Sequence, residues 1–338
     1  MINNNYKNYK SLSKNPNVVS FVPPELEIAI KNCYDKLSLK YKNWDNYIKN
    51  ELGYETISEL YSYLSAEQID AIGLIIEQIK LKSGIILADE TGVGKGRTLA
   101  SVYKYCKQNK KKLLFFTYNK DLFSDFVRDL SDIGVDNLEK LHVLHNDVIV
   151  YNKKEEIVFK SNIKNNKKLI EEKNIGDFDL VMTTYAQINS KSSKAKMEWL
   201  KAYCKNAVIV LDESHNAAGD SNTRDNIEVL IKEAVSVVYA SATFLKNEDE
   251  FSLYHKAIDN LNKNNIEYLT NALEDENCEK LRSFFTAYMV ENGKLIRREH
   301  EPMKTKWEHV KIKVDEKIID DVSIIFNDLF EIIEKTKE

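Results

Sequence analysis

The feature that most constrains the fold of this chain is a glycine-rich loop between an apolar run and a helical pattern. The apolar residues 85–88 predict a buried strand, and the loop Asp89–Thr98 follows directly. A helix is expected from Gly96 to Lys107. This order favours phosphate binding, because loop N–H groups and the positive end of the helix face the anion. It therefore predicts a nucleotide site in an α/β fold.

The loop supplies the expected contacts to ATP. Its glycines let backbone N–H groups face the phosphates, and the Lys95 ammonium reaches the terminal phosphates. The expected contacts are Thr91, Gly92, Val93, Gly94, Lys95, Gly96, Arg97 and Thr98. The common form of this loop has Ser or Thr directly after the lysine to bind Mg²⁺, whereas Gly96 and Arg97 stand here. The metal position then falls to Thr98, to water, or more heavily to a second motif.

That second motif, LDESH, comes at the end of the apolar run 207–211. Asp212 is expected to bind Mg²⁺, and Glu213 to orient or deprotonate the attacking water. An apolar strand that ends in Asp-Glu carries little information alone, but here it follows a phosphate loop in the expected order. Lys95, Asp212 and Glu213 are therefore the predicted catalytic residues.

Two further positions complete the predicted site. Ser241-Ala242-Thr243 ends another apolar run, where the hydroxyls of Ser241 and Thr243 can bond the Asp-Glu loop and a moving neighbour. Gln68 lies one helix before the phosphate loop, and its amide carries a donor and an acceptor that can read adenine. A solvated helix position is the alternative for Gln68.

The order of apolar runs predicts the architecture. Continuous runs separated by helical patterns are typical of a parallel sheet sandwiched by helices. The runs are 85–88, 113–116, 180–182, 207–211 and 235–239. The charged segment 150–175 predicts a surface hairpin and helix. The expected organisation is a flexible lead (1–20), a helical accessory region (21–60), an ATP-binding lobe (61–300) and a helical extension (301–338).

Composition excludes several classes of protein. The formal net charge is −4, so contact with nucleic acid requires a local groove rather than an overall basic surface. The four cysteines form no CxxC pair, which argues against a disulfide scaffold and a zinc site. His142 and His145 lie close together without further ligands, so they are expected in a strand and a loop. Neither a secretion signal nor a run of roughly 18 apolar residues occurs, which predicts a cytoplasmic protein without a membrane partner.

These elements, in this order, resemble the superfamily-2 helicases. The residues within the motifs resemble those of the Strawberry-notch-like branch, which includes long bacterial and phage versions. In this branch Gly-Arg follows the loop lysine, as it does here at Gly96-Arg97. The likeness covers most of residues 20 to 300. The matching segments are Phe21–Leu26, Glu51–Ile72, Thr91–Thr98, Phe115–Gly134, Thr183–Ile188, Leu211–Ala217 and Val237–Thr243.

The resemblance implies a two-lobed motor with ATP and Mg²⁺ between two RecA-like lobes and nucleic acid, DNA rather than RNA, crossing both. This chain then corresponds to the first, RecA-like P-loop NTPase lobe. By motif position, Phe116, Thr117 and Tyr118 lie beside the nucleic acid, and Thr183 and Thr184 contact its phosphates. For the two threonines, β-branched strand filling is the alternative.

The sequence departs from the family at its far end. Neither a second lobe nor its arginine fingers are found, and Arg297 and Arg298 come too early to serve as such fingers. One hypothesis is an ATPase whose second lobe lies on another chain or in a missing segment. A second is an ATP-binding or packaged structural module without turnover, which a virion could deliver into a cell. A third, weaker hypothesis is the translocase subunit of a restriction or modification enzyme.

Overall fold

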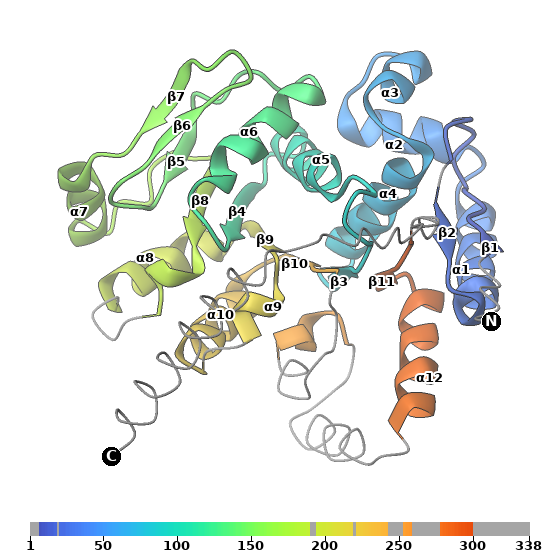
Figure 1. Cartoon of the computed structure of the whole chain (residues 1–338). Coiled ribbons are helices and arrows are strands. Elements are labelled where there is room, and N and C mark those ends of the chain that lie inside the picture. Colours follow the sequence, from blue (N-terminus) through green and yellow to red (C-terminus); the bar gives the residue numbers. More distant parts are fainter. Residues whose placement is uncertain are drawn as a thin grey trace, which may run out of the picture. The chain divides into compact units, whose positions relative to one another are not determined.

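A parallel sheet forms the centre of the computed structural model, which describes residues 7–18, 20–189, 194–218, 221–242, 253–258 and 278–299. These residues all belong to the unit Met1–Glu301, and Pro302–Glu338 forms a second unit. Within the described residues the sheet has seven strands in the order β11-β3-β10-β9-β4-β8-β5 (Figure 1). Their bounds are β3 Gly84–Leu87, β4 Lys112–Thr117, β5 Leu141–Val143, β8 Leu180–Thr184, β9 Ala207–Asp212, β10 Ser236–Ala240 and β11 Leu295–Ile296. All pairings are parallel.

Both faces of this sheet are buried, which explains why the strands are continuously apolar. Side chains alternate between the faces: Ile85 and Leu87 join one core cluster, whereas Ile86 joins the other. The first cluster includes side chains from α2, α4, α5 and α6, and the second includes side chains from α8, α10 and α12. The bounds are α2 Trp44–Leu52, α4 Ala66–Lys80, α5 Lys95–Gln108, α6 Leu122–Asp132, α8 Lys194–Cys204, α10 Ser221–Glu233 and α12 Cys278–Glu291. The predicted α/β sandwich is confirmed.

Shorter elements surround the sandwich. The predicted surface hairpin and helix are present as the antiparallel pair β6–β7 and helix α7. The remaining bounds are β1 Lys7–Asn8, β2 Phe21–Val22, η1 Pro24–Leu26, α1 Glu27–Lys40, α3 Ile57–Tyr63, β6 Ile149–Tyr151, β7 Ile157–Lys160, α7 Ile163–Glu171, η2 Tyr185–Gln187 and α9 His215–Ala218. No helix in the described part combines the length and apolar character needed to cross a bilayer. The expected extension over 301–338 lies outside the described residues.

The N-terminal segment differs from the flexible lead that its polar sequence predicts. The buried carboxylate of Asp70 on α4 accepts hydrogen bonds from this segment, from the hydroxyls of Tyr9 and Ser11 and from the backbone N–H groups of Leu12 and Ser13. The distances range from 2.5 to 3.0 Å. Because a buried carboxylate must be matched by donors, the polar residues of the segment bind it rather than water. Residues 7–18 are therefore part of the structure.

Candidate nucleotide-binding site

The phosphate loop connects the end of β3 to the first residue of α5, as predicted. Gly92 and Gly94 have φ values of 99° and 96°, in the left-handed region that glycine adopts without strain. Gly94 also has no room for a side chain, because a β-carbon there would lie 2.3 Å from Nε2 of Gln68. The loop conformation therefore requires both glycines, and the N-terminus of α5 follows directly at Lys95.

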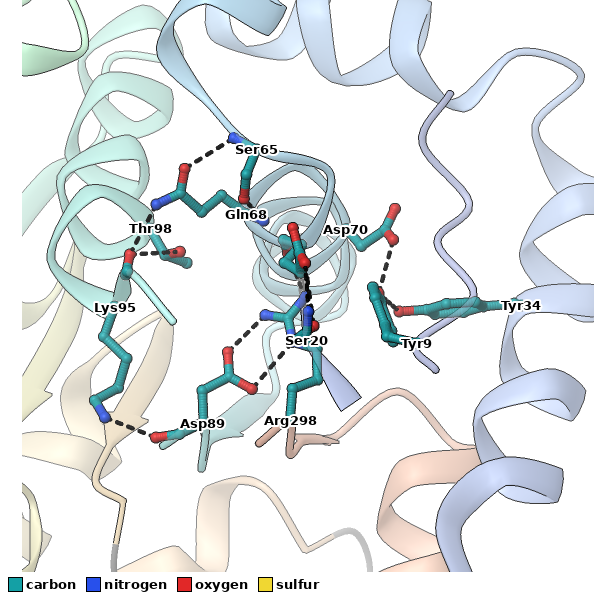
Figure 2. A network of polar contacts seen from close by, with 12 residues as sticks. Tyr9, Ser20, Tyr34, Ser65, Gln68, Asp70, Asp89, Lys95, Thr98 and Arg298 are labelled. Atoms are coloured by element: carbon teal, nitrogen blue, oxygen red, sulfur yellow. Dashed lines mark hydrogen bonds and ion pairs between the residues drawn. The ribbon is translucent and has the colours of Figure 1, made fainter. Parts of the chain in front are cut away.

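The ammonium of Lys95 turns back over the loop. Its Nζ donates a hydrogen bond to the backbone carbonyl of Asp89, at a distance of 2.6 Å (Figure 2). Burial and the charge of Glu213 raise the pKa of the Asp212 carboxyl, and the charge of Lys95 partly opposes that rise. The lysine at the start of α5 and the carboxylate at the end of β9 are thus close enough to interact, although they are far apart in the sequence.

Gln68 contacts the loop directly from the first turn of α4. Its Oε1 accepts a hydrogen bond from the backbone N–H of Ser65 at 2.9 Å, which completes a capping box at the helix N-terminus. Its Nε2 donates to the carbonyl of Gly94 at 3.1 Å (Figure 2). The alternative of a solvated position is excluded, since Gln68 is buried. The adenine contact stays a prediction, and the observed role is to hold the loop against α4.

A cavity of about 520 Å³ opens beside Gln68 and the loop. Aromatic residues of α3 line one side, and the start of α5 with a carboxylate of α6 lines the other. Its lining includes Tyr61, Tyr63, Gln68, Gly94, Arg97 and Asp129. This volume falls in the range of small-molecule sites, and an aromatic wall with a few polar groups suits a nucleotide base.

The unusual glycine after the loop lysine has a packing explanation. A β-carbon on Gly96 would lie 2.1 Å from Oδ2 of Asp129, so α6 fills the space that a serine or threonine side chain needs. The next residue, Arg97, forms an ion pair with Asp132 on the same helix at 3.2 Å. Gly96 and Arg97 therefore both contact α6 from the start of α5.

The hydroxyl of Thr98 is bonded within its own helix. Its side chain is buried, and its hydroxyl donates to the carbonyl of Gly94 at 3.4 Å, one helical turn back. A threonine within a helix makes this bond readily because the carbonyl lies on the same face. The metal contact predicted for Asp212 and Thr98 stays a prediction, and of the two side chains that of Asp212 is the carboxylate.

Asp212 is the last residue of β9 and accepts hydrogen bonds from residues at the ends of β4 and β8. Its Oδ2 accepts a hydrogen bond from the hydroxyl of Thr117, at the end of β4, at 3.3 Å. Its carbonyl accepts one from the hydroxyl of Tyr185, which follows β8, at 2.8 Å. Burial, and then the adjacent charge of Glu213, raise the pKa of the Asp212 carboxyl to about 6.

This arrangement fits Mg²⁺ that arrives with a nucleotide. Among the described residues, no three His, Cys, Asp or Glu side chains gather in a way that could hold a metal ion by themselves. Mg²⁺ is commonly bound by one or two carboxylates, with phosphates and water as its other ligands. A single carboxylate at Asp212, in electrostatic contact with the phosphate-loop lysine, satisfies that requirement.

The residues after Asp212 connect the second motif to the end of β10. Glu213 adopts a φ of 50°, an uncommon conformation for a residue with a side chain and one found at functional sites. The Nδ1 atom of His215 lies 2.9 Å from the hydroxyl of Ser241, and Ser214 N–H donates to the carbonyl of Ala240. The predicted contact of Ser241 with this loop is thus present, whereas Thr243 lies outside the described residues.

The structure corrects most of the residues assigned to nucleic acid. Phe116 is fully buried and stacks on Tyr185, with 5.7 Å between the ring centroids. The hydroxyl of Thr183 donates to the carbonyl of Leu144 at 3.0 Å, and Thr184 is buried as well. Side chains of a strand covered on both faces point into the two cores, so β-branched filling describes the threonines better.

Thr117 binds Asp212 instead, and the exposed member of this set is Tyr118, with 64% of its surface accessible. Tyr118 comes just after β4, where the strand leaves the sheet. The side chain of this residue alone among the five is available for contact with nucleic acid.

Several contacts at the site could not be predicted from the sequence. Asp89 and Arg298 form a buried ion pair at the start of the phosphate loop. Tyr185 and His215 belong to motifs that the sequence shows, but their contacts with Asp212 and Ser241 depend on strand order. Strand order in turn follows from long-range pairing, which apolar runs do not specify.

Comparison with protein families decides the identity of this domain. The model of the family described as P-loop containing NTP hydrolase pore-1 matches residues 45–320. The chain belongs to this family. The match spans the phosphate loop, the Asp212 motif and Ser241, so the family assignment covers the site described above.

Sequence similarity also extends to strawberry notch proteins. The chain is 30% identical over 226 residues to protein strawberry notch homolog 1 of Homo sapiens, which covers 59% of this chain and 15% of the human protein. It is 30% identical over 225 residues to protein strawberry notch of Drosophila melanogaster, covering 59% of this chain and 12% of the fly protein. The similar region is therefore a small part of each relative's length.

Among solved structures, the Sulfolobus solfataricus SWI2/SNF2 ATPase core in complex with dsDNA is similar at a TM-score of 0.48 and 17% sequence identity. The similarity covers 69% of this chain and 43% of that one. The same ATPase core domain in a second structure gives the same TM-score and identity over 72% of this chain.

Proposed function

We propose that this chain is the ATP-binding lobe of a superfamily-2 helicase or translocase of the Strawberry-notch-like branch, in its bacterial or phage form. It couples ATP hydrolysis to movement on nucleic acid, DNA in preference to RNA. The observation that carries the proposal is the set of contacts around Asp212. Its motif, at the end of β9, contacts residues at the ends of β4, β8 and β10 through Thr117, Tyr185 and Ser241. A change at the nucleotide is thereby transmitted along one edge of the sheet.

ATP and Mg²⁺ have complementary partners in this arrangement. Lys95 and the N-terminus of α5 would neutralise the phosphates of a bound nucleotide, and Asp212 would hold Mg²⁺. Glu213 orients the attacking water. The base lies in the cavity beside Gln68, against the tyrosines of α3. Mg²⁺ supplies charge neutralisation of the phosphates when it is bound.

Two lysines lie near His145, just after β5, despite the net charge of −4. Burial, and then the charges of Lys120 and Lys196, lower the pKa of His145, while Asp147, which pairs with Lys120, partly opposes this. These side chains follow or flank β4, β5 and β8, which are neighbours in the sheet. Tyr118 adds an exposed ring at the same edge. Such a combination of cations and an aromatic ring suits phosphates and stacked bases.

The proposal includes a second RecA-like lobe, on another chain or in a segment outside this one, and a location inside a cell. The arginines that complete hydrolysis come from that lobe, because Arg298 is buried against Asp89. The alternative is an ATP-binding module without turnover. Two features of the phosphate loop favour this alternative. Gly96 has no hydroxyl to bind a metal, and the hydroxyl of Thr98 is bonded to the carbonyl of Gly94.

Phosphate release separates the two functions. The chain is assayed with Mg²⁺-ATP, with and without single-stranded DNA, duplex DNA or RNA, and with and without a candidate second lobe. Asp212→Asn and Glu213→Gln serve as variants that retain the fold but lose metal binding or water orientation. The motor lobe predicts nucleic-acid-stimulated release that both variants abolish. ATP binding without release in every combination selects the alternative.

A further inference from the structure

Arg298 follows β11 and is buried beside the phosphate loop. Its side chain and that of Asp89, which it faces, are each 2% exposed. The guanidinium donates to both carboxylate oxygens, from Nε to Oδ1 at 3.1 Å and from Nη2 to Oδ2 at 2.5 Å (Figure 2). The third nitrogen, Nη1, donates to the backbone carbonyl of Glu67 on α4. Arg298 therefore joins the phosphate loop to α4.

Two short paths lead from Arg298 to the groups that hold phosphate. In the first, Arg298 fixes the carboxylate of Asp89, and the carbonyl of Asp89 accepts the hydrogen bond from Lys95. In the second, Arg298 fixes the carbonyl of Glu67, and the next residue, Gln68, donates to the carbonyl of Gly94. Both ends of the loop thus depend on the position of one guanidinium.

The backbone around Arg298 is fixed as well. Glu90 N–H donates to the carbonyl of Arg298 at 3.0 Å, which ties the loop to the segment after β11. Glu299 exchanges two backbone hydrogen bonds with Phe21, at 2.8 and 2.9 Å. The ring of Tyr9 lies 5.1 Å from the guanidinium carbon. The N-terminal segment, the end of the sheet and α4 therefore converge on this side chain.

The charge of Arg298 has a direct consequence for a polyphosphate ligand. Asp89 is buried at the start of the loop, where water screens charge poorly. Without a partner, its carboxylate would repel the phosphates. It would also be free to attract the Lys95 ammonium, which is needed at the terminal phosphates. The bidentate pair removes both effects, and only the planar arginine fork can satisfy two carboxylate oxygens and a carbonyl together.

We propose that Arg298 is a positioning residue of the nucleotide site, which holds Asp89, and through it Lys95, in the geometry that binds the phosphates. This role rests on the proposed ATP-binding function. Arg298 does not contact the nucleotide itself.

The test is a double-mutant cycle on ATP affinity. The dissociation constant for a fluorescent ATP analogue with Mg²⁺ is measured for the full chain and for Arg298→Lys, Lys95→Ala and the double variant. Arg298→Lys keeps the charge but loses the fork, so we expect binding about tenfold weaker. In the Lys95→Ala background the same change should have an effect of less than about threefold, because the main path ends at Lys95.

Controls separate positioning from stability. Leu230→Ala removes a buried side chain on α10, and it should lower the unfolding temperature without changing ATP affinity. Asp89→Asn tests the pair from its other side if Arg298→Lys folds poorly, and it should weaken ATP binding as well. Unchanged affinity in Arg298→Lys, or equal effects with and without Lys95, would overturn the positioning role. Absence of ATP binding by the unaltered chain would instead overturn the proposed function on which it rests.

Discussion

A carboxylate oxygen of Asp129 occupies the space beside Gly96 in which a side chain would begin, 2.1 Å from the position of a β-carbon. Glycine is unfavourable inside a helix, where alanine ordinarily adds roughly 1 kcal/mol of stability. The position of the Asp129 side chain on α6 opposes that preference, since a methyl group at residue 96 would have to displace the carboxylate. The glycine after the loop lysine is therefore matched to the side chain that packs beside it.

Gly96→Ala should lower the free energy of unfolding by about 1–3 kcal/mol, because the new methyl group displaces Asp129. Chemical denaturation measures the change. In an Asp129→Ala background the same substitution should instead stabilise the protein by about 1 kcal/mol. Stabilisation in both backgrounds would show that Asp129 moves aside freely, and the packing explanation of Gly96 would be wrong.

Binding of Mg²⁺-ATP should weaken as the pH falls through about 6. The folded-state pKa of Asp212 is raised from 3.8 to about 6, so the folded protein binds the proton more readily than the unfolded chain does. Between these two pKa values the unfolded chain is ionised while the folded protein still holds the proton. The stability that the protonated carboxyl contributes is therefore lost as the pH rises through about 6. Metal binding needs the ionised form, which gives the opposite trend for the ligand.

Titration of Mg²⁺-ATP between pH 5 and pH 8 tests this dependence. Asp212→Asn should bind more weakly at pH 8 and lose the component that titrates near pH 6. Affinity that titrates identically in both proteins would assign the effect to another group.

Ser241→Ala should reduce the stimulation of ATP hydrolysis by nucleic acid about fivefold, because one hydrogen bond to His215 contributes roughly 1 kcal/mol to the coupling. Hydrolysis without nucleic acid should change less than about threefold. The matched control is Ser236→Ala at the start of β10, the strand that Ser241 follows, because the Ser236 hydroxyl donates to the carbonyl of Ser83 instead. An equal loss of stimulation in both variants would contradict a specific role for Ser241.

Tyr118 and Phe116 should separate binding from folding. Tyr118→Ala removes an exposed ring and should weaken binding of single-stranded DNA about tenfold, with stability changed by less than about 0.5 kcal/mol. Phe116→Ala removes a buried ring and should cost about 3–5 kcal/mol of stability. Fluorescence anisotropy and thermal unfolding measure the two effects. Weaker DNA binding by Phe116→Ala at full stability would restore the original assignment of this residue.

The sequence predicted the elements whose signals are local. The loop at Asp89–Thr98 and the Asp-Glu pair that ends β9 carry their chemistry within a few residues, and long apolar runs mark buried strands. Strands β5 and β11 have only three and two residues, which is too short for a continuous apolar run to predict them.

Side-chain direction could not be predicted, because a strand buried on both faces has no polar side to indicate it. The sequence therefore does not reveal that the side chains of Phe116 and Thr183 are buried, and for Thr183 strand filling was the alternative. The pairing of Arg298 with Asp89 joins positions 209 residues apart, and the polar segment 7–18 is ordered by one buried carboxylate on α4. Both depend on the completed fold.

The most direct test of the central claim is calorimetric titration of the chain with Mg²⁺-ATP, beside Lys95→Ala and the control Lys107→Ala at the end of the same helix. We expect saturable binding by the unaltered chain and by Lys107→Ala. Affinity should be lower by about tenfold or more in Lys95→Ala, since a charged hydrogen bond contributes about 1.5–3 kcal/mol. No saturable binding, or equal affinity in Lys95→Ala, would contradict a nucleotide site at this loop.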